Sequence, residues 1–381
     1  MNKNIPILKD SLRLTLEERN DIKMDELFYP SKIWREAIEP FNFLQYLPEK
    51  ELKNIRMHTM PISGSTILDV AYHPKRESTD EDKLNTFWEA SQYKNLTENL
   101  PEKYCLTEPV PNKFTEKLSL PFKKKLITND LIRYQKFITN LYNLGIFKNL
   151  ENKSKKILIE IGSGYGGLLY HIRKILGDNT ACILVDLPEM IFWSGIYITI
   201  NNPDAKIFIY NPKIHKKKLT IEEIGSYDFL LIPNYKLVEL VGDINFDFAF
   251  NQFSFQEMTE NQINFYCDYI SKNLKGFFVS DNMDIHPSNK EIKVSIIHFL
   301  RKYFKIIPTK TDIELLKKEF TPELWQVYFY FGIPLNLNLN FEIVKPEVLG
   351  ANYKFNFEKN INLDGKNILI KEKKQNLNNL T

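Results

Sequence analysis

The chain has 381 residues, of which 43% are hydrophobic and 13% aromatic, so it can bury a sizeable core and is not intrinsically disordered. Its 51 basic and 48 acidic side chains nearly balance, which leaves no long-range field to favour nucleic acid or an anionic membrane as a partner. Because three scattered cysteines and six histidines form no disulfide or metal-binding pattern and no apolar stretch could span a membrane, we expect a soluble cytoplasmic protein without a metal.

Residues 1–125 have a mixed pattern in which helical segments, such as 31–38 and 81–93, are interrupted by prolines and charge clusters. A stronger helical spacing covers 129–150, with Gly145 near its end. The sequence therefore predicts a mainly helical N-terminal region that leads into a more regular domain.

From residue 156 onward, short apolar runs alternate with helices. The predicted strands are 156–161, 181–187, 227–233, 246–250 and 276–280, with a short extended piece at 207–210 and an aromatic-rich late strand at 323–331. The predicted helices are 167–176, 188–200 and 260–274, while 211–223 is an inserted loop and helix and 371–381 is a polar tail. This alternation predicts a Rossmann-like α/β fold, with a mostly parallel seven-stranded sheet and helices on both faces.

A glycine-rich loop follows the first strand of this domain. Residues 160–167 read Glu-Ile-Gly-Ser-Gly-Tyr-Gly-Gly, and the next helix points its free amide groups at the same place. Glycines at Gly162, Gly164 and Gly166, with Ser163 between them, allow a tight turn and a close approach of a ligand. We therefore expect a cofactor here, rather than a plain strand–turn–helix corner.

Glu160 distinguishes two cofactors, because the glycine pattern alone also satisfies the dinucleotide fingerprint. A carboxylate two residues before the first glycine would repel the pyrophosphate of a dinucleotide. It would instead favour the ammonium group of S-adenosylmethionine, directly or through water. The sequence therefore favours this methyl donor, with S-adenosylhomocysteine as its product.

Two later strand ends complete the predicted cofactor site. Asp186, followed by Leu187, lies where a carboxylate could accept both ribose hydroxyls, although it could also cap the helix that begins near Pro188. Ile232 ends the next strand, where apolar groups would lie against the adenine.

Polar residues crowd the end of the fourth strand, where ligands bind at a topological switch point. We assign Asn251 and Gln252 to the cofactor and Gln256, with Asn282 after strand five, to the substrate.

The chain resembles the sugar O-methyltransferase family of bacterial polysaccharide gene clusters over residues 125–285. The resemblance depends on residues 160–167, 185–189, 254–258 (Ser-Phe-Gln-Glu-Met) and 275–278, and the insertion at 211–223 departs from the family pattern. It implies methyl transfer to a hydroxyl of a sugar or sugar nucleotide, in capsule or lipopolysaccharide biosynthesis.

Such a hydroxyl needs a general base. Glu257, Asp281 and His286 are candidates, although Glu257 could merely favour a helix dipole and His286 could be an ordinary loop histidine. Asp281 and Asp284 alone are too few ligands to predict a metal.

Two alternatives stay open: methylation of another small molecule or an amine nitrogen on the same fold, and a non-catalytic protein that retains it. We expect residues 1–125 to form a lid or the acceptor site, 126–370 the methyltransferase domain and 371–381 a tail. The sequence does not fix the oligomeric state, so a homo-oligomer is compatible with it.

Overall fold

The computed structural model describes residues 3–21, 26–38, 46–58, 62, 90–109, 120–122, 125–284, 286, 289–307 and 327–339. A central sheet is formed by β3 (Lys156–Ile161), β4 (Thr180–Asp186), β5 (Ile207–Ile209), β6 (Phe229–Pro233), β7 (Phe246–Gln252), β8 (Leu274–Met283), β9 (Phe304–Ile307) and β10 (Val327–Pro334). Its eight strands lie in the order β5-β6-β4-β3-β7-β8-β10-β9. The pairings from β5 to β8 are parallel, whereas β10 runs antiparallel to both β8 and β9. The predicted Rossmann-like fold is confirmed, with eight strands rather than seven, because the edge strand β9 was not predicted.

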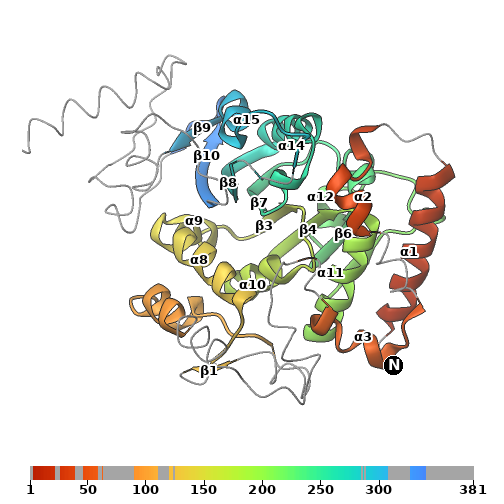
Figure 1. Ribbon diagram of the computed structural model, residues 1–381, viewed down its shortest axis with the longest axis horizontal. Coiled ribbons are helices and arrows are strands. Elements are labelled where there is room, and N and C mark those ends of the chain that lie inside the picture. The colour runs from red at the N-terminus through yellow and green to blue at the C-terminus, as the bar shows by residue number, and fades with distance from the viewer. Residues whose placement is uncertain are drawn as a thin grey trace, which may run out of the picture.

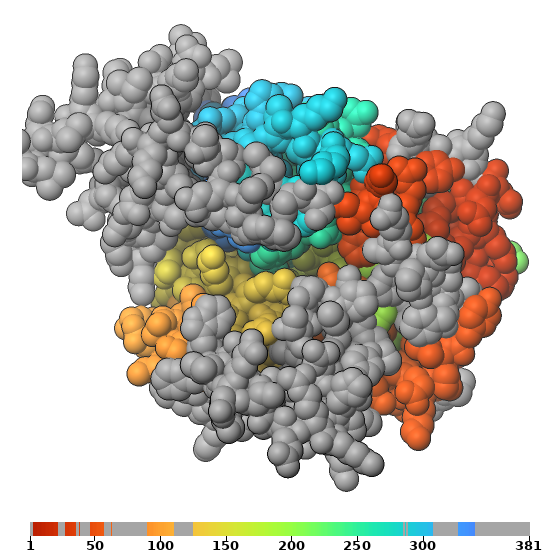
Figure 2. Space-filling view, in the orientation of Figure 1, coloured from red at the N-terminus to blue at the C-terminus, as the bar shows by residue number. Residues whose placement is uncertain are grey.

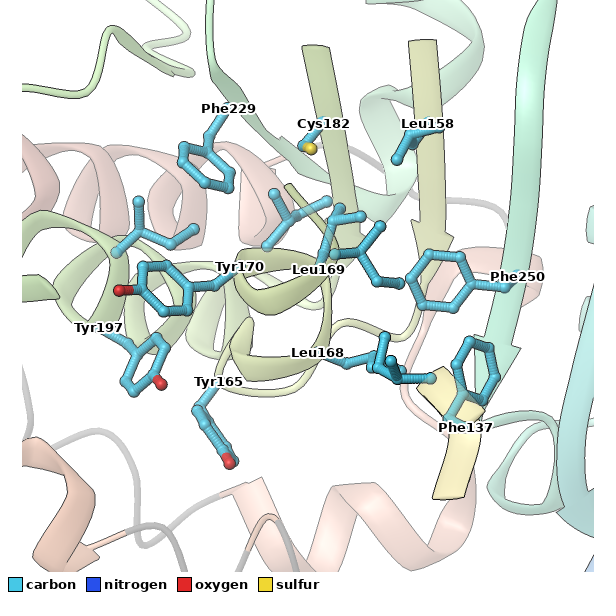
Figure 3. Packing of buried hydrophobic residues seen from close by; sticks show 14 of the residues in the cluster. Phe137, Leu158, Tyr165, Leu168, Leu169, Tyr170, Cys182, Tyr197, Phe229 and Phe250 are labelled. Carbon is cyan, nitrogen blue, oxygen red and sulfur yellow. The ribbon is translucent and has the colours of Figure 1, made fainter. Parts of the chain in front are cut away.

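Helices cover both faces of this sheet (Figure 1). The helices of the domain are α8 (Asn129–Asn143), α9 (Ile146–Glu151), α10 (Gly167–Leu176), α11 (Pro188–Asn201), α12 (Ile221–Ile224), α13 (Leu237–Leu240), α14 (Glu260–Asn273) and α15 (Ile296–Tyr303). Alternate strand residues face opposite layers: Leu158 packs with α8 to α11, and Ile159 packs with α12 to α15. Figure 3 shows the first of these layers, in which Leu158 and Cys182 lie over Leu169 of α10.

The N-terminal region begins with α1 (Asn4–Asp21), which sequence analysis missed. Its buried Ile5, Leu8 and Leu12 follow a helical spacing and pack in the same core as α11. Arg19 joins the two helices, because its guanidinium makes two hydrogen bonds of 2.7 and 3.0 Å to the carboxylate of Glu189. The region is therefore docked on the sheet domain rather than set apart from it.

The remaining described elements of the N-terminal region are short. They include the α-helices α2 (Lys32–Ile38) and α3 (Glu49–Leu52), the 3-10 helices η1 (Glu26–Phe28), η3 (Ile55–His58) and η4 (Glu102–Tyr104), and the two-stranded sheet of β1 (Leu120–Phe122) and β2 (Lys125–Ile127). Residues 90–97 are also helical. The helix predicted at 31–38 is confirmed as α2. Most of the helix predicted at 81–93 lies outside the described residues.

Two other predicted elements differ from the structure at least in part. The single helix expected over 129–150 is wrong, because Gly145 adopts a left-handed conformation (φ 75°) that ends α8 and starts α9. The late strand expected at 323–331 is observed as β10, although the first residues of that range, and the tail 371–381, lie outside the described residues. No described helix combines the length and apolar character needed to cross a bilayer.

Replacing Arg19 by Met should destabilise the protein by about 3–5 kcal/mol, because the Glu189 carboxylate, 1% exposed, would lose its partner. Urea denaturation measures this free energy of unfolding. Arg13→Met is the matched control, because Arg13 pairs on the same helix with Glu17 while both side chains stay about half exposed. We expect the control to change stability by less than about 0.5 kcal/mol. Equal effects of the two substitutions would contradict the docking role of Arg19.

Candidate active site

A cavity of about 470 Å³ opens at the carboxyl ends of β3 and β7. From β3 the chain moves outward to β4 and β6, whereas β7 and β8 lie on the other side of β3, so this is the topological switch point. Its lining includes Glu160 after the apolar part of β3 and Gln252 at the end of β7. The site therefore lies where ligands bind in open α/β sheets.

The glycine loop forms one wall of the cavity. Gly162, Gly164 and Gly166 all have positive φ angles, of 76°, 54° and 78°. A β-carbon on Gly162 would lie 1.9 Å from Ser254 Oγ, so only glycine fits between this loop and the loop that follows β7. The main chain of the loop is therefore exposed to whatever occupies the cavity.

The carboxyl groups of Glu160 and Asp186 both line the cavity beside this loop, and they interact electrostatically. Glu160 is 3% exposed, and its Oε2 has no hydrogen-bond partner among the described residues. Burial raises the pKa of Glu160 well above its usual value, and the nearby charge of Asp186 raises it further. A buried polar atom without a partner is costly, so this position suits a ligand that brings a hydrogen-bond donor or a positive charge.

Asp186 already has two partners in the protein. Its carboxylate accepts hydrogen bonds from the backbone amides of Gly164 and Leu187, both at 2.7 Å. Burial raises the pKa of Asp186 to about 7, while these two amides act in the opposite direction. Asp186 thus fixes the glycine loop from the end of β4 and also lines the cavity.

Polar side chains at the ends of β7 and β8 form the layer beneath the cavity. Asn251 Nδ2 donates to the carbonyl of Ile161 (2.6 Å), and Asn282 Nδ2 donates to Asn251 Oδ1 (2.8 Å) and to Ser280 Oγ (2.9 Å). Asn251 and Asn282 are fully buried. This network ties β3, β7 and β8 together where the site is built.

Phe253, just after β7, is the only described residue other than glycine with a positive φ angle (56°). Such a conformation in a bulky residue is strained by about 1–3 kcal/mol. The ring of Phe253 lines the cavity, and the guanidinium of Arg133 lies over it at 5.2 Å. The strain is concentrated at the site.

Glu257 and His286 line the same cavity. The indole N–H of Trp34, from α2, donates to Glu257 Oε2 at 2.8 Å. Burial raises the pKa of Glu257 to about 7, against the effect of the Trp34 hydrogen bond, with a further rise from Asp186 and a smaller lowering by Arg133. Burial lowers the pKa of His286, so burial disfavours the charged form of both side chains.

The N-terminal segment that supplies Trp34 is held across the cavity by side chains of the sheet domain. Gln262 Nε2 donates to the carbonyls of Leu27 (2.9 Å) and Tyr29 (2.7 Å), and Asn234 Nδ2 donates to that of Phe28 (2.9 Å). In the space-filling view, the red N-terminal residues lie against the cyan residues of the C-terminal half of the chain (Figure 2). This segment therefore forms a wall of the site.

The structure brings together most of the side chains that the sequence singled out. Those that line the cavity are Glu160, Gly162, Ser163, Gly164, Asp186, Leu187, Gln252, Gln256, Glu257 and His286. Those outside its lining are Gly166, which precedes α10, Ile232, which is fully buried in the core, Asn251 and Asn282, which form the layer beneath, and Asp281, whose Oδ2 accepts from Gln252 at 2.9 Å.

Sequence reasoning missed Trp34, Arg133, Tyr134 and Phe253, all of which line the cavity. Arg133 gave no distinctive signal, because α8 also carries the charged residues Asp130 and Lys136. Trp34 gave no local signal, because its contact with Glu257 spans more than two hundred residues of sequence.

Asp284, which sequence analysis considered together with Asp281, accepts from the backbone amide of Ile297 at 3.0 Å, so it supports the start of α15. Within the described part of the chain, no three His, Cys, Asp or Glu side chains are grouped so that they could hold a metal ion.

Neither a protein-family model nor a curated protein sequence matches this chain. Among solved structures, a TehB-like SAM-dependent methyltransferase from Corynebacterium glutamicum shares 10% identity over 53% of this chain and 96% of its own, with a TM-score of 0.32. A SAM-dependent methyltransferase from Aquifex aeolicus shares 14% identity over 52% and 96%, with a TM-score of 0.30.

A phosphoethanolamine N-methyltransferase from Haemonchus contortus, in complex with S-adenosylhomocysteine, shares 16% identity over 38% of this chain and 27% of its own, with a TM-score of 0.25. Scores this low support no conclusion about the cofactor or substrate of this chain.

Glu257→Gln should stabilise the protein at pH 8 by about 2–3 kcal/mol and leave it unchanged near pH 4. The Glu257 pKa is raised on folding, so its stabilising contribution is present below its unfolded pKa and is lost as pH rises through about 7. Gln can still accept the Trp34 hydrogen bond but cannot ionise. Urea denaturation of both proteins at several pH values measures the difference, and a difference independent of pH would contradict the assigned pKa.

Proposed function

We propose that the protein is an S-adenosylmethionine-dependent methyltransferase that methylates a hydroxyl of a sugar or sugar nucleotide. The observation that best supports the cofactor is Glu160, a buried carboxyl with an unpartnered oxygen, beside a glycine loop at the switch point. The methionine end of S-adenosylmethionine carries an ammonium group that would supply the missing donor. The pyrophosphate of a dinucleotide would supply none.

The other cofactor residues follow from this placement. Ser163 and Leu187 line the cavity beside Glu160, and Asp186 lies where the ribose hydroxyls would come. Because Asp186 already accepts from two amides, it would hold the ribose with its remaining lone pairs. Ile232 lies in the core behind this wall, so we no longer assign it a direct contact with the adenine.

The acceptor would lie between the glycine loop and the N-terminal wall. When bound, S-adenosylmethionine supplies an electrophilic methyl group, and the protein must hold the acceptor oxygen in line with it. Glu257 would take the hydroxyl proton as the oxygen bonds to the methyl carbon and the methyl–sulfur bond breaks, which leaves S-adenosylhomocysteine as the neutral product. Trp34 would position the Glu257 carboxylate. Gln256 and His286 would bind the acceptor from the same side of the cavity.

The division of the chain is proposed accordingly: residues 126–370 form the methyltransferase domain, and 1–125 supply a wall of the acceptor site. Aromatic side chains in this wall and opposite it, such as Trp34 and Tyr134, suit the apolar face of a sugar ring. Methylation of an amine on the same fold is the second candidate, and a screen of nucleotide sugars against small amines would distinguish the two.

Glu160→Gln should weaken the binding of S-adenosylmethionine and S-adenosylhomocysteine about 10- to 100-fold, because it removes a charge-assisted hydrogen bond. Isothermal titration calorimetry in buffers of different ionisation enthalpy should also show proton release on binding, since an arriving ammonium favours the ionised Glu160. The exposed Glu222→Gln is the control. Unchanged affinity in Glu160→Gln, or binding of NAD instead, would refute the cofactor assignment.

Glu257→Gln should lower kcat by about 10²–10⁴-fold with an identified acceptor. In the unmodified enzyme, kcat/KM should fall below about pH 7, because the base must be ionised. Trp34→Phe should move this acidic limb to higher pH, because it removes the N–H that favours the carboxylate. Unchanged turnover in Glu257→Gln would remove the proposed base, and an unmoved limb in Trp34→Phe would limit Trp34 to packing.

A further inference from the structure

Four charged side chains form a chain of contacts that ends at the cavity. Arg56 donates to Glu108 Oε1 at 2.8 Å and to Asp130 Oδ2 at 3.0 Å, and the other oxygen of Asp130 accepts from Arg133. The carboxylates of Glu108 and Asp130 are only 2% exposed. The Arg133 side chain keeps 33% of its surface accessible, and it lines the cavity.

This arrangement fixes the orientation of the Arg133 guanidinium. Asp130 holds it from one side, and the ring of the strained Phe253 lies under it at 5.2 Å. Asp130 is fixed in turn by Arg56, whose guanidinium also lies over the ring of Tyr165, a residue of the glycine loop, at 4.6 Å. Burying such charges is costly, and the last of these four charged side chains, Arg133, lines the cavity. This placement favours a role for Arg133 in ligand binding in addition to any role in stability.

The helix that bears Arg133 packs directly against the glycine loop. A β-carbon placed on Gly167 would lie 2.8 Å from a ring atom of Tyr134, the neighbour of Arg133 on α8. Both Arg133 and Glu160 line the one cavity. The site thus places the Arg133 guanidinium and the buried Glu160 carboxyl in one cavity. These two groups complement a ligand end that carries both a negative and a positive charge.

We propose that Arg133 binds the α-carboxylate of the methionine portion of S-adenosylmethionine, while Glu160 binds its ammonium group. This inference rests on the proposed function. The planar guanidinium can hold a carboxylate with two parallel hydrogen bonds, which an ammonium side chain cannot. Asp130 is then a positioning residue, because it acts on the ligand only through Arg133.

The test compares two ligands that differ only in the carboxylate: S-adenosylhomocysteine and its decarboxylated form, which keeps the amine. In the unmodified protein, calorimetry should give the decarboxylated ligand a dissociation constant about 10- to 100-fold higher. Arg133→Met should weaken S-adenosylhomocysteine by a similar factor and leave the decarboxylated ligand within about threefold. Arg133→Lys should give an intermediate loss for S-adenosylhomocysteine, because it keeps the charge without the fork.

Lys136→Met is the matched control, since Lys136 is an exposed cation one turn along α8 and does not line the cavity. It should change neither affinity. Equal losses for the two ligands in Arg133→Met would overturn the proposal and leave Arg133 a role in shaping the site. Unchanged affinity for S-adenosylhomocysteine, with a raised KM for the acceptor, would overturn it in favour of an anionic group on the acceptor.

If Arg133→Met does not fold, the unmodified protein still decides, because equal affinities for the two ligands would overturn the proposal. Failure of the unmodified protein to bind S-adenosylhomocysteine at all would instead refute the proposed function.

Discussion

The site is organised around a carboxyl group that the protein buries and leaves without a full set of partners. Glu160 lies at the end of a strand buried along its whole length, next to a turn in which glycine is sterically required. Burial and the Asp186 charge both raise the pKa of Glu160, so both oppose its ionisation. A cation that binds at this position would give the buried carboxyl oxygen the partner that it lacks in the folded protein. This interaction would therefore favour binding of a cationic ligand group.

The surrounding contacts fix the segments that form the cavity next to Glu160. Asn251 joins the ends of β3 and β7 from below, and Asp186 holds the glycine loop from the side through the Gly164 amide. The N-terminal segment is fixed above by Gln262 and Asn234, which places Trp34 against Glu257. These contacts join segments that are remote in sequence, so one wall of the cavity forms only where the N-terminal region packs against the sheet domain.

Local patterns predicted the central elements to within a few residues, because they depend on short-range rules. The strand that contains Glu160, the glycine loop and α10 were identified from apolar runs, glycine chemistry and helical spacing. The break at Gly145 was missed because glycine within a helical pattern can either be tolerated or end the helix. The spacing of Ile5, Leu8 and Leu12 indicates the buried face of α1, but charged residues between them obscured the helical pattern.

The sequence patterns could not predict which side chains at the strand ends line the cavity and which lie beneath it. Asn251 and Gln252 are adjacent, yet one lies beneath the cavity and the other lines it, since successive strand residues point to opposite sides. The contacts of Trp34 with Glu257 and of Arg56 with Glu108 and Asp130 depend on tertiary packing and leave no spacing to detect.

The most direct test is a crystal structure of the protein with S-adenosylhomocysteine. The account predicts the ligand across the glycine loop, with its ammonium group within hydrogen-bonding distance of the Glu160 carboxylate or joined to it by one water molecule. An empty cavity, or a ligand whose amino-acid end lies away from Glu160, would contradict it.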